Sequence, residues 1–199
     1  IKSRALTVPE GVVTEYTELA FYSNALDTKT SGFDLVADYT MGSTNVGLAL
    51  NHNETEVTGQ NQINGEDPVK IGTVDNLELN LPKDRLVTTV THTFSDALSA
   101  MVRINYYGES WDERGVYLDH DDDPEKHNTK DKIEAAMFMD IEIDYRISDN
   151  LSLVIGANNA LNQFPTQIAT RAGQGMPYPR RSPLGYHGGM MFTRLTYNF

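Results

Sequence analysis

The 199-residue sequence predicts an all-β protein, an antiparallel up-and-down meander of about seven or eight strands. Three observations indicate this fold class. Apolar and polar residues alternate with a period of two in several segments, as in strands whose two faces meet different environments. The connections between these segments alternate between short turns and long polar loops. The last residues, 191–199, form one more alternating segment.

The first half of the chain contains three clear candidate strands and one weaker candidate. The segments 33–41 and 44–53 are joined at Gly42-Ser43, and the apolar face of the first carries Phe33 and Leu35. The segment 86–94 is rich in Thr and β-branched residues, which strands favour. A further strand around 14–22 is expected from a less regular pattern.

The second half gives the most regular alternation. The segment 98–107 follows a short turn at Ser95-Asp96, and the segment 133–147 has one fully apolar face and one mostly charged face. After a turn at 148–150, the segment 151–158 alternates again. At about 15 residues, 133–147 is long for a globular strand but sufficient for a tilted strand that crosses a membrane.

The loop lengths favour a transmembrane β-barrel. Short turns at 42–43, 95–96 and 148–150 fall at one end of the strands, and long polar segments at 54–83, 109–132 and 162–187 fall at the other. Outer-membrane barrels show this pattern of short periplasmic turns and long extracellular loops. Periodicity alone leaves open a soluble sandwich whose apolar face is its core. His92 shares the apolar phase of its strand, so it is expected at the membrane interface or at a bulge.

Composition excludes several classes of protein. The net charge of −12 argues against a nucleic-acid partner, which requires clustered Lys and Arg. The sequence has no run of 18 apolar residues, so it predicts no transmembrane helix. There is no cysteine, so a thiolate metal site is excluded. The start at Ile1-Lys2 is neither a methionine nor a signal peptide, so the chain is expected to be mature, trimmed or excised from a longer one.

Three segments together resemble TonB-dependent outer-membrane receptors. Residues 24–35 resemble their Asn…Thr-x-Gly-(aliphatic or aromatic)-(Asp/Glu)-Leu segment. Residues 155–165, Ile-Gly-Ala-Asn-Asn-Ala-Leu-Asn-Gln-Phe-Pro, resemble their Gly-x-Asn-Asn-Leu-x-(Asp/Asn)-x-x-Pro segment near the end of the barrel. Residues 182–199 resemble the last loop and last strand. The order of these segments and their distance from the C-terminus carry the resemblance.

The resemblance implies a plugged barrel of about 22 strands. Residues 1–199 would then be the C-terminal part of the larger barrel, with the plug domain and the N-terminal barrel strands absent from this chain. The complete receptor would lie in the outer membrane and import a scarce ligand such as a ferric siderophore. Its partners would be the membrane lipid, the rest of the receptor, TonB through the missing N-terminal part, and a small metal chelate.

The resemblance also implies a role for the aromatic residues at the chain end. Tyr197 and Phe199 would be recognised by the outer-membrane assembly machinery. The residues that bind the transported ligand are not identified by the sequence.

No catalytic residues, resident cofactor or enzyme activity is expected. No nucleophile elbow or HExxH motif occurs. Asp119, Asp121 and Asp123 are candidates for a surface cation site, but Pro124 and Lys130 stand where a calcium-binding EF-hand requires Gly and Glu. Asp140, Glu142 and Asp144 form a carboxylate row that is expected to pair with arginines of other strands or to be hydrated.

Two other functions remain open at this point. The chain could be a complete small outer-membrane barrel that acts as a pore or an adhesin, since eight strands can close a barrel. It could also be a soluble β-sandwich that binds cations or sugars through the acidic loop.

Overall fold

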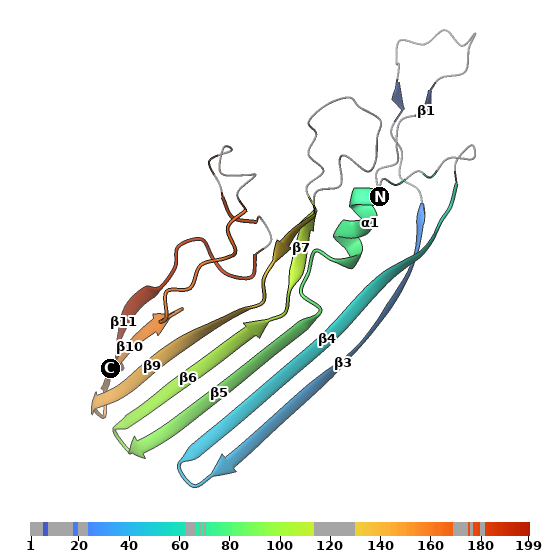
Figure 1. Ribbon diagram of the computed structural model, residues 1–199. Helices are drawn as coiled ribbons and strands as arrows, with labels where there is room; N and C mark the ends of the chain where they lie inside the picture. Colours follow the sequence, from blue (N-terminus) through green and yellow to red (C-terminus); the bar gives the residue numbers. More distant parts are fainter. Residues whose placement is uncertain are drawn as a thin grey trace.

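A seven-stranded antiparallel sheet dominates the computed structural model, which describes residues 6–7, 18–19, 24–62, 67, 69, 71–113, 130–168, 175, 177–179 and 182–199. The strand order is β11-β10-β9-β6-β5-β4-β3. Neighbours in space are neighbours along the chain, except that a separate β7–β8 hairpin lies between β6 and β9 in sequence. The predicted all-β meander is therefore confirmed, and Figure 1 shows its strands running side by side.

The elements have the following bounds. The sheet contains β3 (Leu26–Met41), β4 (Thr44–Gln60), β5 (Asp84–Ser95), β6 (Leu98–Tyr107), β9 (Ala136–Ser148), β10 (Leu151–Asn158) and β11 (Met190–Tyr197). Outside it lie the pair β1 (Leu6–Thr7) and β2 (Glu18–Leu19), the hairpin β7 (Ser110–Glu113) and β8 (Lys130–Ile133), and the helix α1 (Ile71–Glu78).

Tight turns join the strands at one end of the sheet, which is called the short-turn end. Gly42 has a positive φ of 58° in the β3–β4 turn, a conformation that glycine adopts without steric cost. The other two turns lie at 96–97 and 149–150. The helix and the β7–β8 hairpin lie at the opposite, long-loop end, and the C-terminus lies at the short-turn end (Figure 1). This arrangement agrees with the predicted alternation of loop lengths.

Several predicted strands differ from the structure. β3 begins at Leu26 and not at residue 33, and β4 ends at Gln60 and not at residue 53. The expected strand 133–147 is split, because β8 ends at Ile133 and pairs with β7, whereas β9 begins at Ala136 and pairs with β6 and β10. At the break, the Glu134 amide donates to the Thr166 hydroxyl at 3.0 Å instead of to a neighbouring strand. Of the expected strand 14–22, the structure describes only β2; the remainder falls outside the described residues.

The closing strand is shorter than predicted. β11 ends at Tyr197, not at Phe199, because Asn198 leaves the ladder to pair with the preceding turn. The Asn198 amide donates to the Asn150 carbonyl at 2.9 Å, and the Asn150 side-chain amide donates to the Asn198 carbonyl at 2.8 Å. The chain end is thereby attached to the β9–β10 turn.

The helix α1 lies in the segment expected to be a loop. Its eight residues are too few for a strong periodic signal, and Glu78 at its end accepts a hydrogen bond from the Val57 amide of β4 at 2.7 Å. Tertiary attachment to β4 therefore supports the helix. Within the described part of the chain, no helix is both long enough and apolar enough to cross a membrane.

Close packing between β10 and β11 predicts the effect of a small substitution. A Cβ added at Gly156 would overlap the Phe192 ring and lie 3.0 Å from the Ile141 carbonyl oxygen. We expect Gly156→Ala to lower the free energy of unfolding by about 1–3 kcal/mol, the usual range for overpacking. Urea unfolding in detergent micelles measures the change.

Gly185→Ala is the matched control, because an added Cβ at Gly185 meets no atom within 4 Å. Equal stability of the two variants would show that Phe192 does not constrain Gly156.

Candidate functional site

The strand register gives the sheet two chemically different faces. On β9, Ile141 and Ile143 point to one face and Asp140 and Glu142 to the other, because side chains alternate along a strand. The pairing continues this division across all seven strands. The apolar face carries Phe33, Leu35, Ala37, Tyr39, Met41, Val46, Leu48, Leu50, Leu86, Val90, Ala100, Val102, Ile104, Tyr106, Met137, Met139, Ile141, Ile143, Tyr145, Leu151, Leu153, Ile155, Ala157, Met191, Leu195 and Tyr197.

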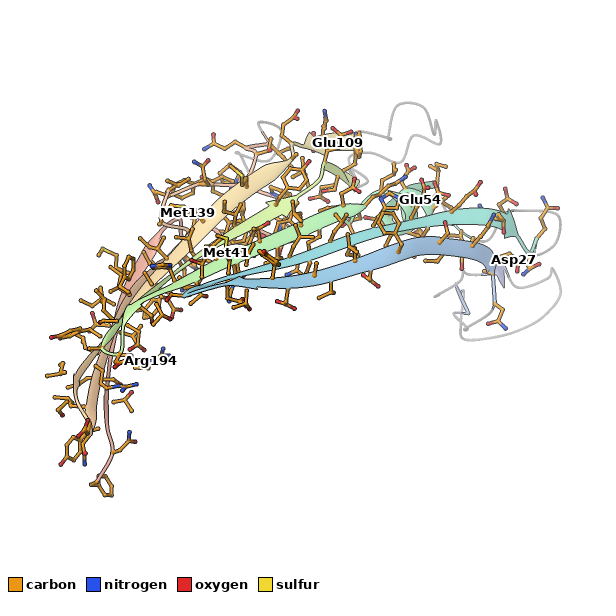
Figure 2. The ribbon with its side chains drawn as sticks, turned by 90° about the horizontal axis from the view of Figure 1, so that it is seen from below. Asp27, Met41, Glu54, Glu109, Met139 and Arg194 are labelled. Atoms are coloured by element: carbon orange, nitrogen blue, oxygen red, sulfur yellow. The ribbon has the colours of Figure 1, made fainter. Side chains whose placement is uncertain are left out.

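Large side chains of the apolar face are exposed. Leu35 and Ile143 are each 50% exposed and Leu195 is 64% exposed, so no described segment packs over them. Soluble monomers rarely expose a continuous apolar patch of more than a few hundred Å². Figure 2 shows side chains projecting from both faces of the curved sheet. The apolar face is therefore a surface for a membrane or for another protein.

The height of the apolar face matches a bilayer. Along β4 it extends from Thr44 to His52, where polar side chains begin. A rise of ~3.4 Å per residue and a tilt of ~40° give this stretch a height of about 20 Å, close to the ~25 Å apolar band of outer-membrane barrels. The remainder of β4, up to Gln60, would stand above the hydrocarbon.

Polar contacts border this band at both ends. At the long-loop end, His52 Nδ1 lies 2.7 Å from Asp84 Oδ1, and Lys83 forms an ion pair with Glu54. At the short-turn end, His92 Nδ1 and Thr44 Oγ1 are hydrogen-bonded at 2.7 Å. His92 thus lies at the band's edge, one of the two positions expected for it. The partners satisfy polar groups where hydrocarbon would give way to water.

The opposite face carries a polar hydrogen-bond network. Asn51 donates to Asp34 at 2.8 Å, and Asn45 donates to the Thr40 hydroxyl at 2.9 Å. On β9, Asp140 accepts from the Asn105 side chain at 3.0 Å and from the Asn159 amide at 2.9 Å.

The carboxylate row on β9 was expected to pair with arginines or to be hydrated. Asp140 instead takes amide donors, although Arg103 lies opposite it in the register. Arg103 donates to the Thr89 hydroxyl at 3.3 Å. The network around these side chains is therefore mainly one of amides and hydroxyls, as suits a wet interior.

The long-loop end is organised by segments distant in sequence. The Asn159 side chain bonds the Gln163 amide and carbonyl at 2.9 and 2.7 Å, and Asn162 Oδ1 accepts from the Gly189 amide at 2.8 Å. On β8, Lys132 Nζ lies 2.9 Å from Glu109 and 3.4 Å from Glu134, and hydrogen bonds to these two carboxylates raise the pKa of Lys132. The Asn162 bond joins the two ends of the β10–β11 loop. The Lys132 ion pairs join β8 to the residues that precede β7 and follow β8.

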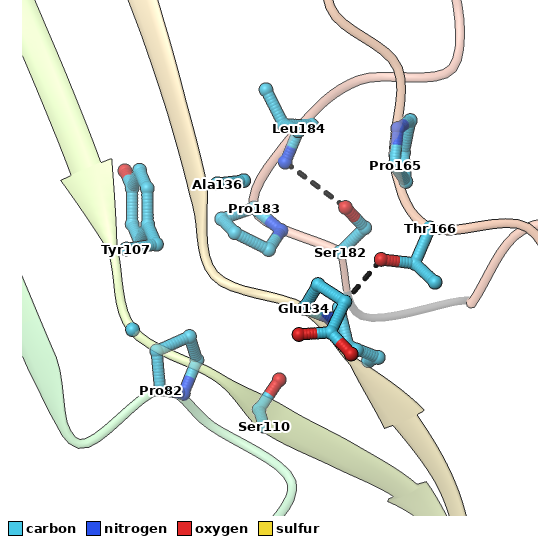
Figure 3. A pocket seen from close by; sticks show the side chains of 12 residues that line it. Pro82, Tyr107, Ser110, Glu134, Ala136, Pro165, Thr166, Ser182, Pro183 and Leu184 are labelled. Atoms are coloured by element: carbon cyan, nitrogen blue, oxygen red, sulfur yellow. Dashed lines mark hydrogen bonds between the residues drawn. The ribbon is translucent and has the colours of Figure 1, made fainter.

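A small cavity lies where these segments meet. It is lined by Tyr107 and Ala136 of the polar face together with Pro165, Pro183 and Leu184 of the last loop (Figure 3). Its volume of about 10 Å³ is room for one water molecule, so it is not a ligand cavity. Its lining shows that the β10–β11 loop folds over the polar side of the sheet.

A larger hollow opens at the short-turn end of the sheet. Its volume is about 230 Å³, and Thr93, Ser99, Asp144 and Arg146 are among the residues that line it. These four side chains share the polar phase of their strands, so the hollow opens on the polar face.

The predicted site residues have different outcomes. Tyr197 ends β11, Phe199 is fully exposed, and their ring centroids lie 6.3 Å apart, but their predicted role in assembly is not tested by these positions. Asp119, Asp121 and Asp123 lie outside the described residues. Among the residues that are described, no cluster of three or more His, Cys, Asp or Glu could hold a metal ion.

Comparison with solved structures gives the fold's relatives. The FrpB iron transporter from Neisseria meningitidis (F3-3 variant) matches the whole chain with a TM-score of 0.65 and 15% identity. The ferripyoverdine receptor of the Pseudomonas aeruginosa outer membrane also matches the whole chain, with a TM-score of 0.59 and 15% identity. The siderophore receptor PiuA from Acinetobacter baumannii matches 87% of the chain, with a TM-score of 0.58 and 16% identity.

These matches decide the architecture. The sheet has the fold of a barrel segment of TonB-dependent receptors. The chain spans 27% of the FrpB chain, 23% of the ferripyoverdine receptor and 22% of PiuA. No family model and no curated sequence matches the chain.

We expect the polar face of the sheet to tolerate a new charged side chain and the apolar face not to tolerate one. Val102 lies near the middle of the apolar band, and Met101 is its neighbour on the polar face. We expect Val102→Arg to destabilise the protein in lipid vesicles by about 2–4 kcal/mol, because arginine in hydrocarbon loses its hydration. Urea unfolding of the vesicle-inserted protein measures this cost.

Met101→Arg is the control and should change stability by under ~1 kcal/mol, because its side chain meets a wet face. A similar loss in both variants would contradict the assignment of the faces.

Proposed function

We propose that residues 1–199 are the C-terminal part of the barrel of a TonB-dependent receptor in the outer membrane. The plug domain and the N-terminal barrel strands would belong to other parts of the complete protein. The observation that carries the proposal is the exposed apolar band, whose height is close to that of the ~25 Å apolar band of outer-membrane barrels and which is bordered by polar pairs. The barrel fold of the matched receptors supports it.

The proposed activity is uptake of a scarce ligand such as a ferric siderophore. The matched proteins include an iron transporter, a siderophore receptor and a receptor bound to ferripyoverdine. In this proposal the chain supplies barrel wall and extracellular loops, the lipid contacts the apolar face, and the remaining strands and the plug complete the pore. TonB would supply energy through the N-terminal part, and no residue of this chain would perform covalent chemistry.

The alternatives fit the described residues less well. A complete small barrel requires the sheet to close on itself, whereas in the described sheet β3 and β11 are two opposite edges. A soluble sandwich requires a second sheet over the apolar face, whose side chains are instead exposed.

Growth under iron limitation tests the proposed uptake. We expect the complete protein to restore growth with a ferric siderophore as the only iron source, in an outer-membrane host that lacks its own receptors. The same host without TonB should not grow, because the proposed import depends on energy from the inner membrane. Iron-55 accumulation measures uptake directly.

Accumulation that is independent of TonB would contradict the receptor and favour a pore. If no hydroxamate or catecholate chelate leads to iron accumulation, the result would contradict the proposal that the ligand is a ferric siderophore.

The proposed assembly signal has its own test. Phe199 is fully exposed beyond β11, so its side chain adds little to folded stability. We expect Phe199→Ser to reduce the amount of protein in the outer membrane several-fold while the purified protein unfolds at an unchanged urea concentration. Immunoblots of membrane fractions measure the amount.

Asn198→Ser is the control, because the hydrogen bonds between Asn198 and Asn150 use the Asn198 backbone. Equal membrane levels of both variants would show that the assembly machinery does not recognise the Phe199 ring.

A further inference from the structure

We propose that the small cavity between β7 and the β10–β11 loop binds one water molecule, which bridges the Ser110 hydroxyl to the hydroxyls of Thr166 and Ser182. Ser110 begins β7, and Thr166 and Ser182 lie in the first and second halves of the loop. The bridging water joins the β7–β8 hairpin to the loop, so that the two segments move together. The proposal does not depend on the proposed uptake function.

The Ser110 side chain is the observation that points to a bound molecule. Ser110 is 1% exposed, and within the described part of the chain its Oγ has no hydrogen-bond partner. Figure 3 shows this hydroxyl directed into the cavity, toward Glu134. Buried polar groups in native proteins are nearly always hydrogen-bonded to protein or to ordered water, because an unbonded buried hydroxyl loses its hydration without compensation. The Ser110 hydroxyl therefore requires a partner inside the cavity.

The two loop hydroxyls that line the cavity each have a hydrogen to donate. The Thr166 hydroxyl accepts from the Glu134 amide at 3.0 Å, and the Ser182 hydroxyl accepts from the Leu184 amide at 3.1 Å. These bonds use an oxygen lone pair and leave each O–H donor for another acceptor. A water oxygen accepts from both loop hydroxyls, and a water hydrogen is donated to Ser110. Three hydrogen bonds are typical of a buried water.

The size and charge of the cavity select a neutral water. The volume of about 10 Å³ holds one water molecule and no larger organic group. The Glu134 carboxylate also lines the cavity and attracts cations, but Lys132 Nζ lies 3.4 Å from Glu134 Oε2 and offsets that charge. Lys132 repels a second cation and does not repel a water molecule. A water is therefore favoured over a bound metal ion.

The walls of the cavity are ordered before the water binds. On the hairpin side, Ser110 pairs with Ile133 of β8, and the Trp111 amide donates to the Leu79 carbonyl at 2.9 Å. On the loop side, Pro165 and Leu184 are buried. A water that bridges two ordered walls is nearly as favourable in enthalpy as a direct hydrogen bond.

The bridge adds a connection that the direct contacts do not provide. The Glu134–Thr166 hydrogen bond attaches the loop to the residues that follow β8. The water extends this attachment to β7 through Ser110, and to the second half of the loop through Ser182. Loosening either the hairpin or the loop should therefore loosen the other.

Hydrogen–deuterium exchange of the complete protein in detergent tests the bridge from both sides. Ser110→Ala removes the hairpin's bond to the water, so we expect the Leu184 amide of the loop to exchange about three- to tenfold faster. Ser182→Ala removes a loop bond to the water, so the Trp111 amide of the hairpin should exchange faster by a similar factor. The factor corresponds to one net hydrogen bond. Mass spectrometry with residue-level fragmentation measures both rates.

Ser31→Ala is the matched control, because Ser31 is exposed on β3, and it should leave both exchange rates unchanged. A high-resolution crystal structure of the wild-type protein gives a direct second measurement. We expect an ordered water about 2.5–3.0 Å from Ser110 Oγ, the usual distance between hydrogen-bonded oxygens. This measurement decides the proposal even if a variant fails to fold.

A dry cavity predicts the opposite result. In that case Ser110→Ala removes an unsatisfied hydroxyl, which is neutral or stabilising, and the Leu184 amide would exchange at an unchanged or slower rate. Such a rate, or a wild-type crystal structure without a water at Ser110, would overturn the proposal. An unchanged Trp111 rate in Ser182→Ala would equally overturn the coupling between the loop and the hairpin.

Discussion

Cross-strand register is the constraint on which the rest of this structure depends. Because side chains alternate along a strand, a slip of one residue would move every apolar side chain of that strand to the polar face. The pairing of Val46 with Val90, and of Val90 with Val102, keeps one phase across β4, β5 and β6. Short turns such as that at Gly42 limit slippage between hairpin partners. The apolar band exists only because this alignment is maintained.

In the proposed membrane environment, the two edge strands of the sheet need hydrogen-bond partners for their backbone groups. β3 and β11 each present one side without a partner in the described sheet. Hydrocarbon offers no hydrogen bonds, so open strand edges are not tolerated there. In the proposed receptor, the remaining strands of the barrel would satisfy both edges, which explains how a single curved layer with an exposed apolar face could be stable.

The polar side of the sheet and the last loop form one structural unit. Asp140 connects β9 to β6 through Asn105 and to the loop through the Asn159 amide. This carboxylate therefore links the sheet to the start of the β10–β11 loop. Its row on β9 was expected to pair with arginines or to be hydrated, and the donors to Asp140 are the amides of Asn105 and Asn159. Local hydrogen bonding, and not net charge, organises this region.

The sequence by itself determined the meander, since alternation in 98–107 and 151–158 matches β6 and β10 residue for residue. It also indicated both faces, because period-two patterns encode them locally. Only the tertiary structure decided the break at Glu134, the helix α1 and the meeting of Phe164 with Tyr178 and Tyr186. These features depend on contacts between distant segments, such as Glu134 with Thr166, which no local pattern records.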